Sequence, residues 1–150
     1  MAVLAAIGAA AVVVFPKNST PTNPFSQNIK SSANFNLYYP TQLPDGYSIK
    51  SSSIQLKDGV LTYAATRADL RIVFTMQAVP ANFNFQSFYQ QYLKNTQQFH
   101  TAYGQAVMGN IQNRVLSSMT DGKTWFILSD NSPNVSGGEL RLIMNSLKQY

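Results

Sequence analysis

The alternation of apolar and polar side chains in the last third of the chain predicts a β-hairpin followed by a helix. Residues 114–129 read as two strands joined by Thr120-Asp121-Gly122-Lys123, because an Asp-Gly pair tolerates the positive φ values of a two-residue turn. The second strand is apolar on both faces, so we expect it inside a sheet that is covered on two sides. Residues 137–149 then predict a helix that covers one face, starting at a capping box of Ser136 and Glu139.

Earlier segments predict further strands. They show period-two alternation or apolar runs between turn residues, and Lys57-Asp58-Gly59 matches a second hairpin turn. Residues 97–103 fit either a loop or an irregular strand. The predicted strands cover residues 34–39, which end before Pro40, and residues 48–56, 60–65, 70–79 and 105–111.

A second amphipathic helix is predicted after residue 80. Asn82 and Asn84 are both candidate N-caps, and Lys94 and Asn95 suit the C-terminus. Five apolar residues at i, i+3, i+4, i+7 and i+8 form one wide stripe, which favours packing against a sheet. These residues are Phe85, Phe88, Tyr89, Tyr92 and Leu93.

Strands outnumber helices in this pattern, and short turns join neighbouring strands. We therefore predict an α+β fold with a mainly antiparallel sheet of about six to seven strands. Two amphipathic helices are expected to pack on the sheet, and an apolar helix is expected before it.

The N-terminal third divides into an apolar run, a linker and the start of the domain. Residues 1–15 contain no charged side chain, and as a helix they would be about 21 Å long, against a hydrocarbon core of roughly 30 Å. We expect residues 1–16 to be a membrane anchor or uncleaved signal segment, and one interpretation is the outer part of a longer signal anchor. A cleaved signal peptide and a buried core helix are the alternatives. Residues 17–33, rich in Pro, Ser, Thr and Asn, predict a flexible linker, and residues 34–150 a single α+β domain.

Composition narrows the function classes. Charged residues are only 11% of the chain, against roughly 25% in a typical soluble domain, and this low share is common in exported surface proteins. The net charge is +5, but the 11 Lys and Arg residues are scattered singly, whereas nucleic-acid sites cluster them. We therefore expect no nucleic-acid partner. The absence of cysteine excludes disulfides and thiolate metal sites.

Few residues offer catalytic or metal-binding chemistry. His100 is the single histidine, so a zinc site with several His or Cys ligands is not expected. Asp45, Asp58 and Asp121 precede glycines and suit turns, and Glu139 suits helix capping. We expect no metal, no cofactor and no enzymatic activity. A small hydrolase that uses His100 as a base is the alternative.

Binding is the remaining class, since the chain is rich in aromatic residues. Most of them fall on predicted core faces. A cleft lined by the less firmly placed tyrosines, with an arginine on its rim, would suit an apolar or sugar-like ligand. The candidate residues are Tyr38, Tyr39, Tyr47, Tyr103, Arg71 and Arg114.

The order of motifs resembles a known kind of domain. Residues 36–47 read N-L-Y-Y-P-x-x-L-P-D-G-Y, which is similar to the opening of uncharacterised bacterial extracytoplasmic domains tethered by one N-terminal helix. The later parts of that pattern are matched by Gly104 and Gly109, Trp125, and Ser146-Leu147. The layout over residues 34–149 also resembles the PsbP-like α/β/α sandwich. The resemblance implies a non-enzymatic accessory or binding domain of the cell envelope, and it transfers no catalytic residue.

Together these features predict a membrane-tethered, extracytoplasmic binding or accessory domain of a bacterial cell envelope. Its partners would be the lipid bilayer, through the N-terminal helix, and a protein or cell-surface ligand. The chain would be a single-pass protein of the cell membrane, with its C-terminal domain outside the cytoplasm. A pilus-like assembly subunit that packs through its N-terminal helix is a further alternative.

Cell fractionation tests the predicted tether. The full-length chain is expected in the membrane fraction, and deletion of residues 1–16 is expected to release it, because the apolar run would supply the membrane affinity. The substitution Lys17→Ala, which leaves the apolar run intact, serves as the control and should leave the chain on the membrane. Recovery of the full-length chain only in the cytosol would contradict the prediction.

Overall fold

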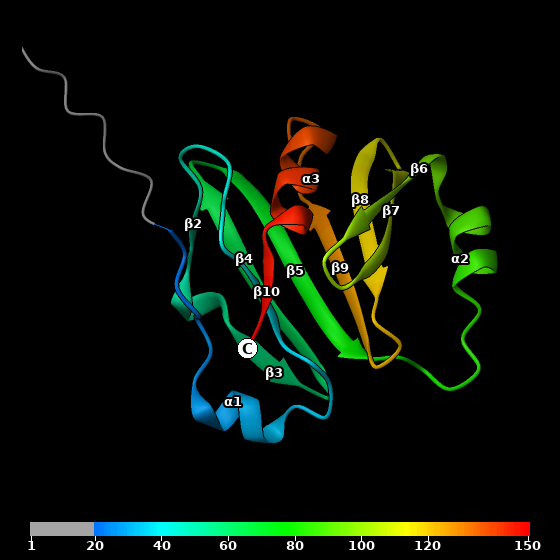
Figure 1. Ribbon diagram of the computed structural model, residues 1–150. Helices are drawn as coiled ribbons and strands as arrows, with labels where there is room; N and C mark the ends of the chain where they lie inside the picture. Colours follow the sequence, from blue (N-terminus) through cyan, green and yellow to red (C-terminus); the bar gives the residue numbers. More distant parts are fainter. Residues whose placement is uncertain (1–19) are drawn as a thin grey trace, which may run out of the picture.

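An antiparallel β-sheet with helices on both faces is the centre of the fold (Figure 1). The computed structural model describes residues 20–150. Its helices are α1 (Gln27–Ser32), α2 (Phe85–Tyr92) and α3 (Gly137–Asn145), with a short 3-10 helix at Ser51–Ser53. Its strands are β1 (Tyr38–Pro40), β2 (Ser48–Ile49), β3 (Gln55–Lys57), β4 (Val60–Arg67), β5 (Leu70–Ala78), β6 (Lys94–Thr101), β7 (Gly104–Ile111), β8 (Arg114–Thr120), β9 (Thr124–Asp130) and β10 (Leu147–Gln149).

The strands form one large sheet and one small one. The large sheet has the order β2-β4-β5-β9-β8-β7-β6, with β3 also paired to β4, and β1 and β10 form a separate pair. All these pairs are antiparallel. The predicted α+β class with a mainly antiparallel sheet is therefore confirmed. The strand after the predicted hairpin turn, β9, lies between β5 and β8, inside the sheet as expected.

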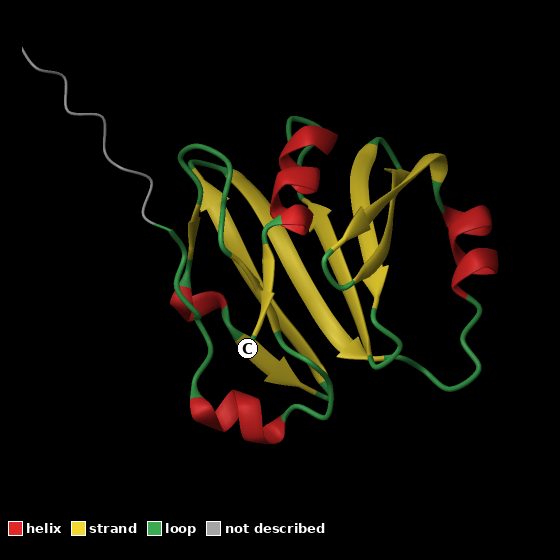
Figure 2. Cartoon of the chain, in the orientation of Figure 1, coloured by secondary structure: helices red, strands yellow, loops and turns green. Residues whose placement is uncertain are grey.

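One face of the sheet carries the hydrophobic core. The strand register aligns Leu61, Met76, Phe126 and Met119 across four neighbouring strands, and each is at most 1% exposed. Full burial of one such side chain contributes about 1.5–3 kcal/mol. We call this the core face. It is covered by α3 (Figure 2), which contributes Leu140, Ile143 and Met144. The β1–β10 pair adds Tyr38, Tyr39 and Leu147 to the same core.

Three predicted turns and caps are found in the structure. Asp58 and Gly59 have φ values of 51° and 76° in the β3–β4 turn. The Leu43–Tyr47 segment turns with a hydrogen bond from Tyr47 N to Pro44 O (3.1 Å). The predicted capping box also forms at the start of α3.

The β8–β9 hairpin is present, but its turn is shifted by one residue from the prediction. The backbone N–H of Asp121 donates to Thr124 O (3.3 Å), so Gly122 and Lys123 are the central residues. Gly122 has the positive φ, 89°. Asp121 keeps an ordinary backbone conformation, because its carboxylate accepts hydrogen bonds from Lys123 N (2.8 Å) and Thr124 N (2.6 Å).

Residues 48–56 do not form the single strand that their pattern predicted. The 3-10 helix Ser51–Ser53 separates β2 from β3. The Ser53 hydroxyl donates to Lys50 O (2.5 Å) and accepts from Ala64 N (2.9 Å). Serine hydroxyls that bond to nearby backbone groups offer the chain an alternative to a regular strand.

The final helix ends at Asn145 rather than at residue 149. Leu147–Gln149 forms β10 and pairs with β1, so the C-terminus is extended. At the junction Thr41 N and Thr41 Oγ1 donate to Ser146 O (2.9 and 2.8 Å). These bonds to a segment distant in sequence replace the last helical turn.

Three other boundaries differ from the sequence pattern. Pro40 lies within β1, whose three residues are all buried, so residues 34–39 do not alternate as predicted. α2 ends at Tyr92, because Leu93 is extended and Lys94 already starts β6. The ambiguous residues 97–103 belong mainly to β6, which has an irregular register between Lys94 and Gln97.

The predicted anchor at residues 1–16 lies outside the described residues, and the division at residues 16 and 33 stays a prediction. Residues 20–33, expected to be linker, contain α1, and Phe25 is 6% exposed with its ring 5.4 Å from that of Tyr63. Among residues 20–150, none of the helices combines the length and apolar character needed to cross a bilayer.

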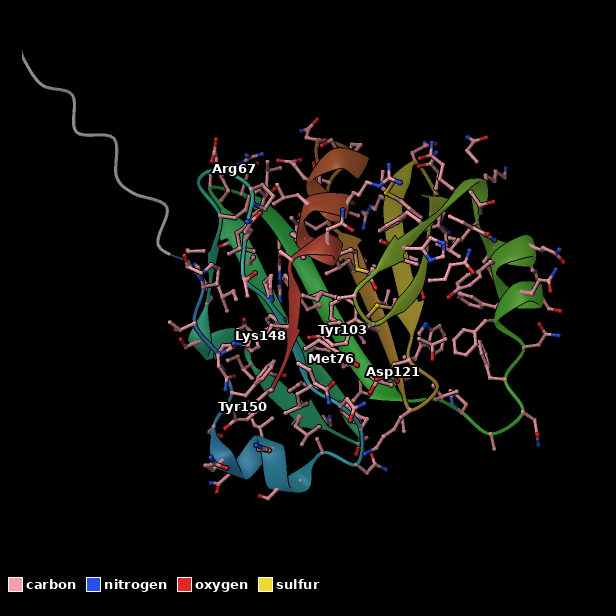
Figure 3. The ribbon with its side chains drawn as sticks, viewed as in Figure 1. Arg67, Met76, Tyr103, Asp121, Lys148 and Tyr150 are labelled. Carbon is pink, nitrogen blue, oxygen red and sulfur yellow. The ribbon has the colours of Figure 1, made fainter. Side chains whose placement is uncertain are left out.

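Asp121 ties the β8–β9 turn to the segment that leads into β1. Its carboxylate accepts hydrogen bonds from the Tyr38 hydroxyl and from Asn36 Nδ2 (2.8 Å). Asn36 N also donates to Thr124 Oγ1 (2.8 Å). The ring of Tyr103 lies 4.8 Å from that of Tyr38, close to Met76 and Asp121 (Figure 3).

This arrangement shifts two pKa values. Burial, and then the hydrogen bond to Asp121, raise the pKa of the Tyr38 hydroxyl well above its ordinary value. Burial alone would raise the pKa of Asp121, but hydrogen bonds from Tyr38, Thr124, Asn36 and Lys123 outweigh it and lower that pKa. A carboxylate with a lowered pKa stabilises the folded state above its unfolded pKa, and this contribution is lost as the pH falls through the folded pKa.

The substitution Asp121→Asn is expected to lower the free energy of unfolding at pH 7 by about 1–3 kcal/mol, because it weakens several hydrogen bonds to a charged acceptor. The difference from the wild type should shrink between about pH 5 and pH 2, as the wild-type carboxylate becomes protonated. Urea unfolding curves at several pH values measure both effects. Asp58→Asn, in the exposed β3–β4 turn, is the control and should show little pH-dependent difference. A difference for Asp121→Asn that stays constant with pH would contradict the role of its charge.

Candidate ligand-binding cleft

The helix predicted from the aromatic stripe is present as α2, and Asn84 is its N-cap. The Asn84 side chain accepts a hydrogen bond from Ser87 N (2.9 Å), whereas Asn82 has a positive φ of 60° outside the helix. Every side chain of α2 keeps some solvent exposure, and Tyr92 is 49% exposed. α2 therefore lies against the sheet without being enclosed by it, beside the β6–β7 hairpin (Figure 1).

Trp125 holds α2 against the second face of the sheet. It directly precedes the core residue Phe126 in β9, and neighbouring residues of a strand point to opposite faces of the sheet. The rings of Phe83, Phe85 and Phe88 lie 4.8, 5.4 and 5.4 Å from that of Trp125, which is 8% exposed. Aromatic pairs of this kind each contribute about 0.5–1.5 kcal/mol beyond their buried area.

The hydroxyl of Ser118 adds a polar attachment below this cluster. Trp125 Nε1 donates to Ser118 Oγ (2.9 Å), and the Tyr89 hydroxyl lies 2.9 Å from the same oxygen. Burial raises the pKa of Tyr89, and the hydrogen bond with Ser118 partly offsets this. These contacts orient both the indole and the helix, because each uses a directional hydrogen bond.

Between α2 and strands β6, β7 and β8 lies an open cleft of about 730 Å³, which we call the α2 cleft. This volume is within the range of roughly 300–1,000 Å³ that is typical of small-molecule sites. The described residues that line it are all uncharged. The helix wall consists of Phe85, Gln86, Tyr89, Gln90 and Leu93, and the sheet wall of Thr96, Gln98, Gln105, Val107 and Thr120.

The sheet wall is ordered by the strand register. Gln98 pairs with Val107 and His100 with Gln105 across β6 and β7. Gln105 Nε2 donates to Gln98 Oε1 (2.8 Å), so the two amides are joined. The amide nitrogen of Gln98 and the amide oxygen of Gln105 remain available for further hydrogen bonds.

Gly104 and Gly109, the glycines of the sequence pattern, are required by the geometry around the cleft. A Cβ on Gly109 would lie 2.9 Å from Leu93 Cβ and 3.1 Å from Lys94 O, so glycine lets the end of α2 approach β7. Gly104 has a φ of 146°, and a Cβ there would lie 2.9 Å from Thr120 O. Both positions therefore fix backbone packing next to the cleft.

The tyrosines proposed from the sequence lie away from the α2 cleft. Tyr38 and Tyr39 are buried, and the structure brings Tyr38 together with Tyr103 on the core side. The Tyr103 hydroxyl accepts a hydrogen bond from Gln149 N (3.0 Å). Tyr38 and Tyr103 thus link β1, β10 and the β6–β7 turn.

Tyr47 and the arginines lie near the opposite end of the sheet from Asp121. Tyr47 is buried under Arg67, whose guanidinium carbon is 4.5 Å from the ring centre, and it lines a hollow of about 490 Å³ beside residues 20–24. Arg67 also forms a salt bridge with Glu139 (3.1 Å). Arg71 and Arg114 are exposed at strand starts, and neither lines the α2 cleft.

His100 is exposed on β6 next to Gln105. Its side chain makes no hydrogen bond within residues 20–150, and this part of the chain contains no group of three or more His, Asp or Glu residues that would hold a metal ion.

Sequence reasoning missed the residues of the α2 cleft. Gln86 and Gln90 lay on the polar side of the predicted helix, Gln98 lay in the segment that fitted either a loop or a strand, and Gln105 lay at the start of a predicted strand. Glutamines recur on both sides of residue 93, and this recurrence is a feature of the sequence that could have indicated a polar site. That they line one cleft depends on how α2 lies over β6 and β7.

The chain was compared with protein-family models, with curated proteins and with solved structures, and none of the three comparisons found a match.

Phe88→Ala tests how far the aromatic cluster holds α2 on the sheet. The substitution is expected to lower the free energy of unfolding by about 1–3 kcal/mol, since it removes a half-buried ring. It should also shift the emission of Trp125, the single tryptophan, to longer wavelength, because water reaches the indole. Gln91→Ala, at an exposed position of α2, is the matched control and should change neither quantity. Unchanged emission in Phe88→Ala would show that the helix does not depend on this contact.

Proposed function

We propose that the protein is a membrane-tethered, extracytoplasmic binding domain of a bacterial cell envelope, without catalytic activity, and that it holds its ligand in the α2 cleft. The single observation that carries the binding role is this cleft of about 730 Å³, with mixed polar and aromatic walls. Clefts of this size and lining are the usual form of ligand sites.

The chemistry of the lining supports binding rather than catalysis. The described residues of the α2 cleft include no carboxylate, imidazole or amine. They offer hydrogen bonds from amides and hydroxyls, and contact area from rings and aliphatic side chains. Such groups hold a ligand, but they are poor general acids or bases near neutral pH.

The proposed location is supported by the sequence. The first 15 residues carry no charged side chain, and only 11% of the chain is charged. The resemblance of residues 36–47 to tethered extracytoplasmic domains favours the same location. The α2 cleft, on a domain joined to such an anchor, would face the cell-envelope space.

A single-cysteine probe tests whether the α2 cleft is the binding site. The chain contains no cysteine, so Gln90→Cys places a single label in the cleft. Gln55→Cys places a control label on β3, which pairs with β4 toward the opposite edge of the sheet from β6. With a solvent-sensitive dye, the label at residue 90 is expected to change its emission saturably when a bacterial envelope fraction is added. The label at residue 55 should not change. Phe85→Ala in the Gln90→Cys background should weaken the response.

Equal responses at the two positions would show non-specific adsorption. No response at residue 90 would show that the cleft is not occupied by an envelope component. Either result would overturn the proposed function.

A further inference from the structure

We infer that the α2 cleft binds a neutral carbohydrate chain. The inference rests on the proposed function and names the class of its ligand. Three independent features of the cleft support it: its lack of charge, its paired amides and its aromatic wall.

The uncharged lining of the cleft argues against anionic and cationic ligands. The chain has a net charge of +5, yet the described lining includes no Lys, Arg, Asp or Glu side chain. Phosphate and carboxylate groups are normally held by Arg or Lys side chains, or by free N–H groups at a helix N-terminus. At the N-terminus of α2, which borders the cleft, the Ser87 N–H already donates to Asn84 Oδ1. A charged ligand would lose its hydration in the cleft without gaining a partner of opposite charge. The ligand is therefore uncharged.

The amides specify a ligand that both donates and accepts hydrogen bonds. Gln86 and Gln90 on the helix wall face the cleft together with Gln98 and Gln105 on the sheet wall. The bond between Gln105 Nε2 and Gln98 Oε1 leaves the amide nitrogen of Gln98 free to donate and the amide oxygen of Gln105 free to accept. Neighbouring hydroxyls on a sugar ring match this pair, because each hydroxyl can donate and accept.

The aromatic side chains supply a surface for the less polar faces of a sugar ring. Phe85 and Tyr89 are partly exposed in the helix wall. The Tyr89 hydroxyl is already hydrogen-bonded to Ser118, so this residue presents its ring rather than its hydroxyl. Leu93 and Val107 complete the apolar contact area. A ligand with both hydroxyls and apolar C–H faces uses all these groups.

A peptide ligand fits the site less well. An extended peptide would pair its backbone with the free edge of β6, which is the last strand of the sheet. The glutamines instead project from the face of β6 and β7 toward α2. The polar groups of the cleft are therefore placed for a ligand that lies on the sheet face.

Titration of the full-length chain with neutral oligosaccharides tests the inference. The probes are chitohexaose, cellohexaose and maltoheptaose, and the readouts are Trp125 emission and isothermal titration calorimetry. At least one probe is expected to bind saturably, with an affinity that does not change with added salt, because no charge contributes. Oligogalacturonate and a heparin hexasaccharide, which are anionic, should not bind in the cleft.

Variants locate the binding. Gln98→Ala and Gln105→Ala are each expected to weaken binding about tenfold, the effect of losing hydrogen bonds worth about 1.4 kcal/mol. Both positions are exposed, so folding should be retained, and thermal unfolding checks this. Gln55→Ala on β3 is the matched control and should bind as the wild type does. Phe85→Ala should also weaken binding.

Two results would overturn the inference. The first is that none of the neutral probes binds, or that Gln98→Ala, Gln105→Ala and Gln55→Ala all bind alike. The second is stronger, salt-sensitive binding of the anionic oligosaccharides. If the label at residue 90 still responds to the envelope fraction, only the ligand class is wrong. If it does not respond, the proposed function falls as well.

Discussion

Large apolar side chains on both faces of β9 are covered by other elements, and this requirement places the two helices. Phe126 and Leu128 point into the core beneath α3, and Trp125 points to the other face beneath α2. A strand with apolar side chains on both faces needs other elements packed on each face, because exposing either face to water would lose the stabilisation from burying large side chains. The two helices therefore belong on opposite faces, and β9 sits between β5 and β8 where neither of its edges is free.

The two faces are covered in different ways. On the core face, α3, β10 and the segment before β1 form a continuous layer, tied to the β8–β9 turn by Asp121 and Tyr38. On the second face, the short helix α2 is attached mainly around Trp125 and Ser118. α2 also contacts the sheet at its end, where Leu93 packs against Gly109 of β7. The α2 cleft lies open between the helix and strands β6–β8, because one short helix covers this face only in part.

The cleft joins chemistry from segments that are distant along the chain. Helix residues near 85–93 and strand residues near 96–120 contribute amides, hydroxyls and rings, and its described lining is uncharged. Tyr38 and Tyr103, in contrast, serve the packing of the domain itself. They link β1, β10 and the β6–β7 turn, which explains without a ligand why Tyr38 is buried and Tyr103 partly buried.

Local elements whose signals are short-range could be predicted from the amino-acid sequence alone. The stripe of α2, the Asn84 cap, the Ser136–Glu139 capping box, the Asp58-Gly59 turn and the alternation of β5 depend on neighbouring residues alone, so they were predictable. Tertiary contacts decided the two segments for which the predicted element was wrong. Hydrogen bonds of Ser53 interrupt the predicted strand, and pairing with β1 makes Leu147–Gln149 a strand rather than a helix. The same holds for the candidate site. The residue types in the cleft could be read from the sequence. Whether the helix residues face the strand residues depends on where Trp125 holds α2 over the sheet, and no periodicity along the chain encodes that position.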